Sequence, residues 1–148
     1  MLSWFIASIH LIALGIGLGA ITVRAVALRG NLQTEQLPRV FLADTLWGIA
    51  ALLWISTGLW RAFGGLEKGT DYYLANHVFH AKMGLLVLIL LLELWPMITL
   101  IRWRIARLRG QLIDLAPAAA MARISMVQAV LVVGMVFAAT AMARGLGF

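Results

Sequence analysis

Four long apolar runs constrain this chain more than any other feature of its sequence. Each is about 20 residues long, the length that an α-helix needs to cross the hydrocarbon core of a bilayer. The runs are Leu2–Val23, Val40–Trp60, Val78–Ile101 and Ile124–Met142. The first extends to Leu28 if its helix continues past Arg24. We therefore expect an all-α fold, an integral membrane four-helix bundle in which residues 1–148 form a single domain.

The composition supports a membrane protein whose main partner is the lipid bilayer. Hydrophobic residues make up 63% of the chain, against roughly 45–50% in soluble domains. The net charge of +6 does not indicate nucleic-acid binding, because the arginines cluster beside the apolar runs. Cysteine is absent, which excludes disulfides and thiolate metal sites.

The positive charges predict the orientation of the chain. The first and third connections with their flanks carry eight of the 12 lysines and arginines, and the second connection and the C-terminal end carry four. Loops rich in lysine and arginine stay on the cytoplasmic side. We therefore expect a multi-pass protein of the bacterial inner membrane with both termini in the periplasm.

Small residues on the first run predict how its helix packs. Gly15 and Gly19 form a GxxxG pair, which favours close association of membrane helices and predicts a homo-oligomer. Ala13 and Gly17 share a helix face with His10. That face suits either close helix packing or a flat ligand.

Four ionisable side chains fall inside the apolar runs and are candidate functional residues, because burying such groups in a bilayer is unfavourable. They are His10, Asp44, Lys82 and Glu93. We interpret Asp44 as an interfacial residue stabilised by the dipole at the start of its helix. Arg24, Arg39 or Arg102 could extend to either Asp44 or Glu93, and the role of Glu93, one turn before Pro96, stays open.

The segment HVFHAK, His77–Lys82, stands where a polar loop meets the third run. His77 and His80 are three residues apart and share a helix face, so with His10 they are candidate metal ligands. Lys82 projects from the other side of that helix. His10 and Lys82 lie at the same depth only if the first helix continues to Leu28.

Two segments resemble a known enzyme family. SIHLIALGIG (residues 8–17) and HAKMGLLVLILLLELW (residues 80–95) are similar to the corresponding segments of HemJ-type protoporphyrinogen oxidases, which are small haem b proteins of bacterial membranes. The resemblance implies that His10 is an axial haem ligand and that Lys82 is the family's essential lysine. Two further segments, residues 47–74 and 93–104, more closely resemble a family of uncharacterised bacterial predicted membrane proteins.

A haem also needs space between helices and cations for its two propionates. Gly17 on the small-residue face provides the space, and Arg61 and Lys82 provide the cations. His80, His77 or Met83 is the candidate second axial ligand, or the sixth position is open.

We therefore expect a haem b protein that transfers electrons, with a redox partner, or that oxidises a porphyrin or quinol-type substrate. The alternatives are a small ion or metal transporter and a non-catalytic assembly partner in the membrane.

Overall fold

The computed structural model describes all 148 residues, and four long α-helices account for most of them. They are α1 (Leu2–Ala27), α2 (Leu37–Phe63), α4 (His77–Leu108) and α5 (Ala118–Ala143). A 3₁₀ turn, η1 (Thr34–Gln36), precedes α2, and a short helix, α3 (Thr70–Ala75), precedes α4. All four long helices are long and apolar enough to cross a membrane, and there is no β-strand. The prediction of an all-α four-helix membrane protein is confirmed.

Each long helix extends beyond the apolar run that predicted it. The largest differences are at α4, which ends at Leu108 and not at Ile101, and at α5, which begins at Ala118 and not at Ile124. Arginine and alanine are good helix formers, so the arginine-rich flank of α4 and the alanine-rich flank of α5 continue these helices. At about 1.5 Å per residue, the 32 residues of α4 exceed the roughly 30 Å of the hydrocarbon core. The helix ends therefore project into the polar region of the bilayer.

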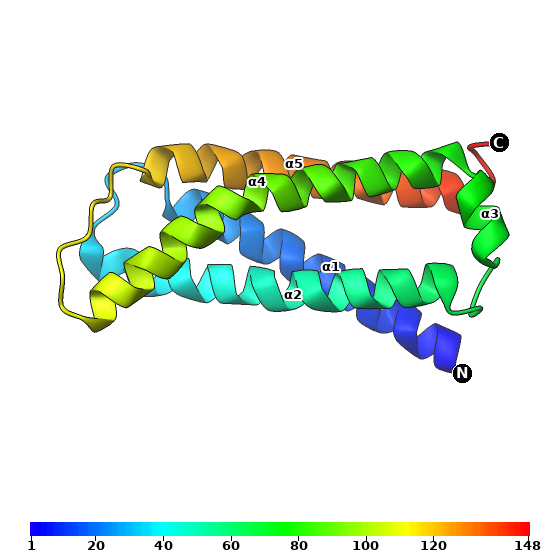
Figure 1. Cartoon of the computed structure of the whole chain (residues 1–148), viewed down its shortest axis with the longest axis horizontal. Coiled ribbons are helices and arrows are strands. Elements are labelled where there is room, and N and C mark those ends of the chain that lie inside the picture. The colour runs from blue at the N-terminus through cyan, green and yellow to red at the C-terminus, as the bar shows by residue number, and fades with distance from the viewer.

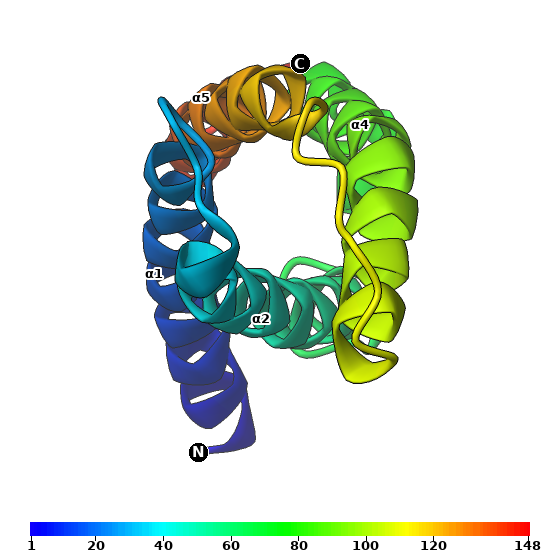
Figure 2. The ribbon, with the colours of Figure 1, turned by 90° about the vertical axis from the view of Figure 1, so that its left-hand side faces the viewer.

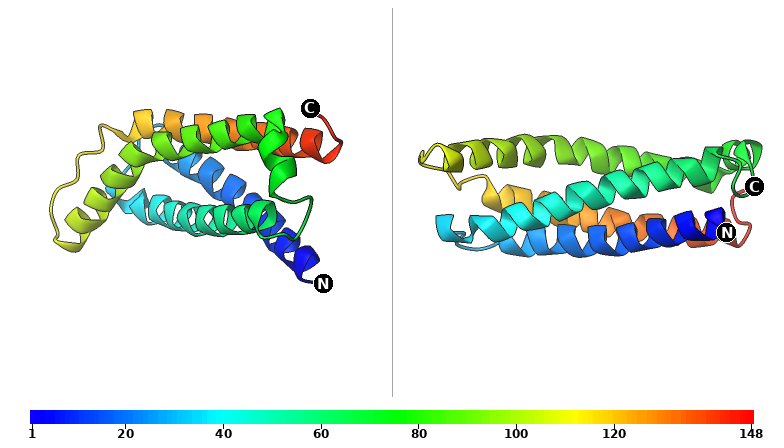
Figure 3. Two further views of the ribbon diagram at one scale, coloured as in Figure 1. Left: turned by 45° about the vertical axis from the view of Figure 1, so that its right-hand side comes forward. Right: turned by 90° about the horizontal axis from the view of Figure 1, so that it is seen from below.

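The connections and the termini divide between the two ends of the bundle. The loops at residues 28–36 and 109–117 lie together at one end, and α3 lies with both termini at the other (Figures 1 and 3). The two arginine-rich connections therefore lie on the same side of the membrane. This agrees with the positive-inside rule, which predicts that both connections stay on one side.

The helices form a ring in the order α1, α2, α4, α5 (Figure 2). α1 packs against α2 and α5, and α4 packs against α5. α2 and α4 are the neighbours that make the fewest contacts. This side of the ring is therefore the least tightly closed.

Large apolar side chains cover the outside of the ring, as expected for helices that face lipid. They include Leu11, Ile49, Leu91 and Phe137, all of which are exposed. The interior combines alanines with large side chains such as Trp47 and Trp54. Gly15 and Gly19 point outward and have nothing within 4 Å of the position of a Cβ atom, so no other helix of the chain packs on them.

Pro96 lies in the middle of α4. A proline inside a helix removes a backbone donor and bends the helix. Figure 1 shows the first part of α4 running beside α5 and the second part turning toward α2. As a result Arg104 reaches α2, where it donates to the backbone oxygen of Phe41 at 2.9 Å.

Asn76 joins the C-terminal tail to the start of α4. Its side-chain oxygen accepts from the backbone N–H groups of Val78 and Phe79, and its amide donates to the backbone oxygen of Leu146. The backbone N–H of His77 donates to Gly147. The tail therefore holds the junction of α3 and α4 in place.

Candidate functional site

His10 lies inside the protein, on the side of α1 that faces α2. Its side chain is buried, and its Nδ1 atom lies 2.9 Å from Oγ1 of Thr57. The imidazole also stacks on the indole of Trp54, with ring centroids 5.8 Å apart. Three neighbours on one helix turn of α2 therefore surround the ring: Trp54, Thr57 and Gly58.

The contacts of Thr57 determine which nitrogen of His10 carries the proton. The Thr57 hydroxyl has a single hydrogen, which it donates to the backbone oxygen of Leu53 at 2.6 Å. Its oxygen is therefore the acceptor for Nδ1–H of His10. In this tautomer Nε2 carries a lone pair, and no hydrogen bond within the protein uses it. A histidine held in this way presents a nitrogen lone pair that can bind a metal ion.

Gly58 makes room for His10. A Cβ atom at this position would lie 3.1 Å from Cε1 of the imidazole, which is closer than ordinary packing allows. The glycine therefore lets the ring lie directly on the surface of α2.

His10 lines a cavity of about 370 Å³ near the α3 end of the bundle. Ligand pockets in proteins commonly measure about 300–1,000 Å³. All four long helices, α3 and the loop before it contribute side chains, and 16 of the 23 lining residues are hydrophobic. The cavity is thus suited to a largely apolar ligand.

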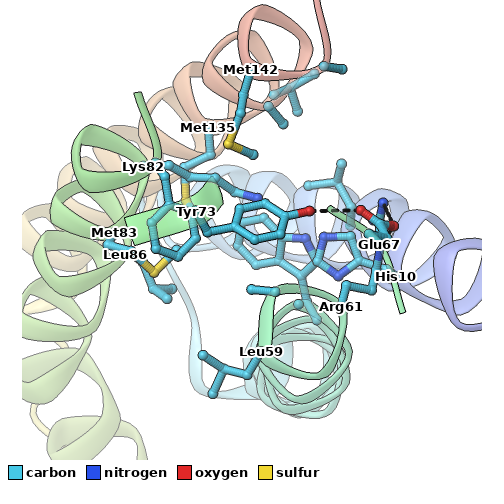
Figure 4. A pocket seen from close by; sticks show the side chains of 18 of the residues that line it. His10, Leu59, Arg61, Glu67, Tyr73, Lys82, Met83, Leu86, Met135 and Met142 are labelled. Carbon is cyan, nitrogen blue, oxygen red and sulfur yellow. Dashed lines mark hydrogen bonds and ion pairs between the residues drawn. The ribbon is translucent and has the colours of Figure 1, made fainter. Parts of the chain in front are cut away.

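The polar side chains that line the cavity include Arg61, Glu67, Tyr73 and Lys82 as well as His10 (Figure 4). Glu67 accepts from Arg61 and, through its other oxygen, from the hydroxyl of Tyr73 at 2.9 Å. Lys82 extends its ammonium group into the same space and has no hydrogen bond or ion pair within the protein. An unpaired cation beside apolar walls favours a ligand that carries a negative charge.

Tyr73 is the titratable residue of α3 whose pKa is clearly shifted by its surroundings. Burial, followed by the hydrogen bond to Glu67 and the charge of that carboxylate, raises the pKa of the phenol to about 12. Its hydroxyl therefore remains a hydrogen-bond donor to Glu67 throughout the physiological range.

The structure brings His10, Lys82 and Arg61 together at one cavity, and it places the other predicted site residues elsewhere. His77 and His80 are exposed, and His80 bonds through Nε2 to the backbone oxygen of Leu74. Gly17 packs against Trp47 and Ala50 of α2 and does not line the cavity. The face of α1 that carries Gly17 thus serves helix packing. No group of three or more His, Asp or Glu side chains is arranged to hold a metal ion.

A second polar cluster crosses the interior nearer the arginine-rich end, and Arg24 is its centre. Arg24 is fully buried and donates from Nη1 to Asp44 and Glu93, from Nη2 to Glu93 and Gln128, and from Nε to Ser125. All distances are 2.8–3.0 Å. The five N–H groups of the guanidinium are thereby satisfied. The cluster joins all four long helices.

This cluster decides between the predicted partners of the two carboxylates, and it corrects one interpretation of the sequence. Of Arg24, Arg39 and Arg102, Arg24 is the one that pairs with Asp44 and Glu93. Asp44 is not an interfacial residue held by the helix dipole, because it lies in the second turn of α2 and bonds to Arg24 and Arg104. The physical reason is that each carboxylate finds a cation on another helix, which is more favourable in the membrane than a distant dipole.

Several residues that line the cavity or hold His10 beside it were missed by sequence reasoning. Thr57 and Gly58 belong to a short interruption of small and polar residues in an otherwise apolar run. This interruption could have marked them as candidates from the sequence. Glu67 and Tyr73 belong to a loop and a short helix whose position follows only from the packing of the bundle.

Comparison with known proteins identifies one family. Residues 2–147 match the family described as predicted membrane protein, DUF2214. No curated protein and no solved structure matches the chain.

Proposed function

This chain belongs to the DUF2214 family of predicted membrane proteins, and we propose that it binds haem b in the cavity at His10. In this proposal it transfers electrons to or from a redox partner, or oxidises a porphyrin or quinol-type compound. The observation that supports it most is the pair of contacts that Thr57 makes with Nδ1 of His10 and with the backbone oxygen of Leu53, from which the tautomer of His10 is inferred. Nδ1–H is held by Thr57, and the lone pair of Nε2 is left for a ligand in an apolar cavity.

The residues around the cavity fit such a group. The imidazole of His10 would provide the axial bond, and its hydrogen bond to Thr57 would hold the ring in one orientation. Of the three candidates for a second ligand, only Met83 lines the cavity, while His77 and His80 do not. The indole N–H of Trp54, which borders the cavity, is buried without a hydrogen-bond partner and so leaves a donor unsatisfied.

The cations differ in what they can contribute. Lys82 has no partner in the protein, so its ammonium is the group that would neutralise a propionate. Arg61 is already paired with Glu67 at 2.6 Å, so it would share its charge between that carboxylate and the ligand. When bound, haem b supplies a one-electron couple, and nearby charges of this kind shift its potential.

The test is the absorption spectrum of the protein purified in detergent from cells that are supplied with haem precursor. The parent is expected to show a Soret band that sharpens on reduction. His10→Ala is expected to lose haem or change its spin state, whereas His80→Ala, at the same end but outside the cavity, should retain the parent spectrum.

Lys82→Met is expected to keep an iron–imidazole spectrum with weaker haem retention and a shifted potential. A colourless parent, or a His10→Ala protein with the parent spectrum, would show that the cavity does not bind haem through His10.

A further inference from the structure

We propose that the groove between the end of α1 and the start of α2 binds the phosphate-bearing headgroup of an anionic phospholipid, with Arg29 and Arg39 as its ligands. The groove has a volume of about 470 Å³. The segments that line it lie at the arginine-rich end of the bundle, whereas α3, which lines the cavity of His10, lies at the opposite end (Figure 1). The inference does not depend on haem binding.

Arg29 and Arg39 have no ion pair or side-chain hydrogen bond within the protein. Arg24 and Arg107, at the same end, use their donors internally: Arg24 binds Asp44 and Glu93, and Arg107 donates to the backbone oxygen of Thr34. The other arginines at this end that have no ion pair do not line the groove. No acidic residue lines the groove. Two free guanidinium groups are therefore available to phosphate oxygens. A guanidinium can bind a phosphate in a bidentate geometry, with two parallel N–H···O hydrogen bonds.

The groove is preformed. Leu28, Leu32 and Leu37, which flank and anchor the connection, are buried in the cluster that contains Trp103. Gly30 adopts a φ of 72°, a left-handed conformation that turns the chain between Arg29 and Asn31. A ligand that binds here would order little additional chain, which favours affinity.

The floor of the groove indicates a lipid and not a soluble anion. Val23 and Val26 on the last turns of α1 line the groove and are exposed on the outside of the bundle, where acyl chains lie. Thr22, Asn31 and Gln36 add polar groups nearer the arginines. Basic pockets at the edge of membrane helices bind anionic headgroups in this arrangement. A phospholipid would satisfy both the apolar floor and the two cations.

The experiment compares two double variants with the same change in charge. Arg29→Gln with Arg39→Gln removes the groove cations. Arg109→Gln with Arg123→Gln removes two exposed arginines at the same end that do not line the groove and have no ion pair. Retained lipids are counted by native mass spectrometry in detergent with added phosphatidylglycerol, phosphatidylcholine of the same acyl chains, or inorganic phosphate.

The parent is expected to retain phosphatidylglycerol in preference to phosphatidylcholine. The groove variant should lose affinity for phosphatidylglycerol about tenfold or more, and the control should stay within about twofold of the parent. Arg39→Lys keeps the positive charge but not the bidentate donor, so its affinity for phosphatidylglycerol should lie between those of the groove variant and the control. This single variant replaces the double variant if the latter cannot be purified.

Three results would overturn the proposal. One is equal loss in both double variants, which would indicate general surface attraction. The second is the absence of a preference for phosphatidylglycerol. The third is competition by inorganic phosphate at the concentration of the lipid, which would show that the arginines hold a free anion.

Discussion

Arg24 of α1 and Glu93 of α4 form a two-pronged ion pair in the interior, with Nη1–Oε1 and Nη2–Oε2 distances of 2.8 Å each. Asp44, Ser125 and Gln128 take the remaining donors of the guanidinium. Because every partner lies on a different turn or helix, the cluster is satisfied only when all four helices have the observed rotation and depth. The cluster thus selects one relative rotation and depth of the four helices. Apolar packing alone specifies these only weakly in a bilayer, because lipid tails are as apolar as the helix surfaces.

The first prediction concerns the stability that this pair provides. Arg24→Gln is expected to lower the free energy of unfolding by about 3–5 kcal/mol, because it leaves two carboxylates without their shared cation. The double variant Arg24→Gln with Glu93→Gln should lose less free energy of unfolding than the sum of the losses in the two single variants. Thermal unfolding in one detergent measures both. Arg102→Gln, an exposed arginine on α4, is the control, and an Arg24→Gln protein as stable as this control would contradict the assignment.

The second prediction concerns the hydrogen bond between Thr57 and His10. Thr57→Val removes the acceptor for Nδ1–H and should weaken haem retention about 10- to 100-fold, as loss of such a supporting bond does at metal sites. Thr57→Ser keeps the hydroxyl and should restore the parent affinity. Haem titration with the absorption spectrum as readout gives both values. Equal affinities for all three proteins would mean that Thr57 does not orient the ring.

The third prediction concerns association of the chain. Gly15 and Gly19 face outward without a neighbour in the chain, so the GxxxG surface is free for another copy. Gly19→Leu should shift the protein toward the monomer in sizing and crosslinking without lowering its unfolding temperature. Gly48→Leu, at another outward glycine that lacks a GxxxG partner, should leave association unchanged. A parent that is monomeric in several mild detergents would refute this prediction.

The fourth prediction is the orientation in the membrane. The two arginine-rich connections lie at the same end of the bundle as each other, and both termini lie at the opposite end. By the positive-inside rule the termini should be periplasmic. Alkaline phosphatase fused after Phe148 should be active, and the same enzyme fused after Gly110 should be inactive. The reverse pattern would invert the predicted topology.

The fifth prediction follows from the pKa of Tyr73. Because the pKa is about 12 in the folded protein and roughly 10 in an unfolded chain, the protonated phenol stabilises the fold. This contribution is complete below pH ~10 and is lost as the pH rises toward 12. In a Tyr72→Phe variant Tyr73 is the only tyrosine. Its ultraviolet titration should have a midpoint near 12, and Glu67→Gln should lower that midpoint. A midpoint near 10 in the folded protein would contradict the buried hydrogen bond.

The sequence alone determined the class of the protein and the number of its spans. Both depend on the length and hydropathy of continuous segments, which are local properties. The boundaries were less accurate, as at α4 and α5, because good helix formers such as arginine and alanine continue a helix into flanks that lie outside the apolar run. His10 and Lys82 were also identified from the sequence, since an ionisable residue in an apolar run stands out wherever it points.

Only the tertiary structure decided what these residues face. Arg24 could extend to the surface or into the protein, and its inward position depends on Asp44, Glu93 and Gln128, which lie 20, 69 and 104 residues away in the chain. The tautomer of His10 likewise depends on Thr57, 47 residues away. Hydrogen bonds and ion pairs act over a few ångströms in space, so the rotation of each helix, which no local pattern encodes, determines which polar groups meet.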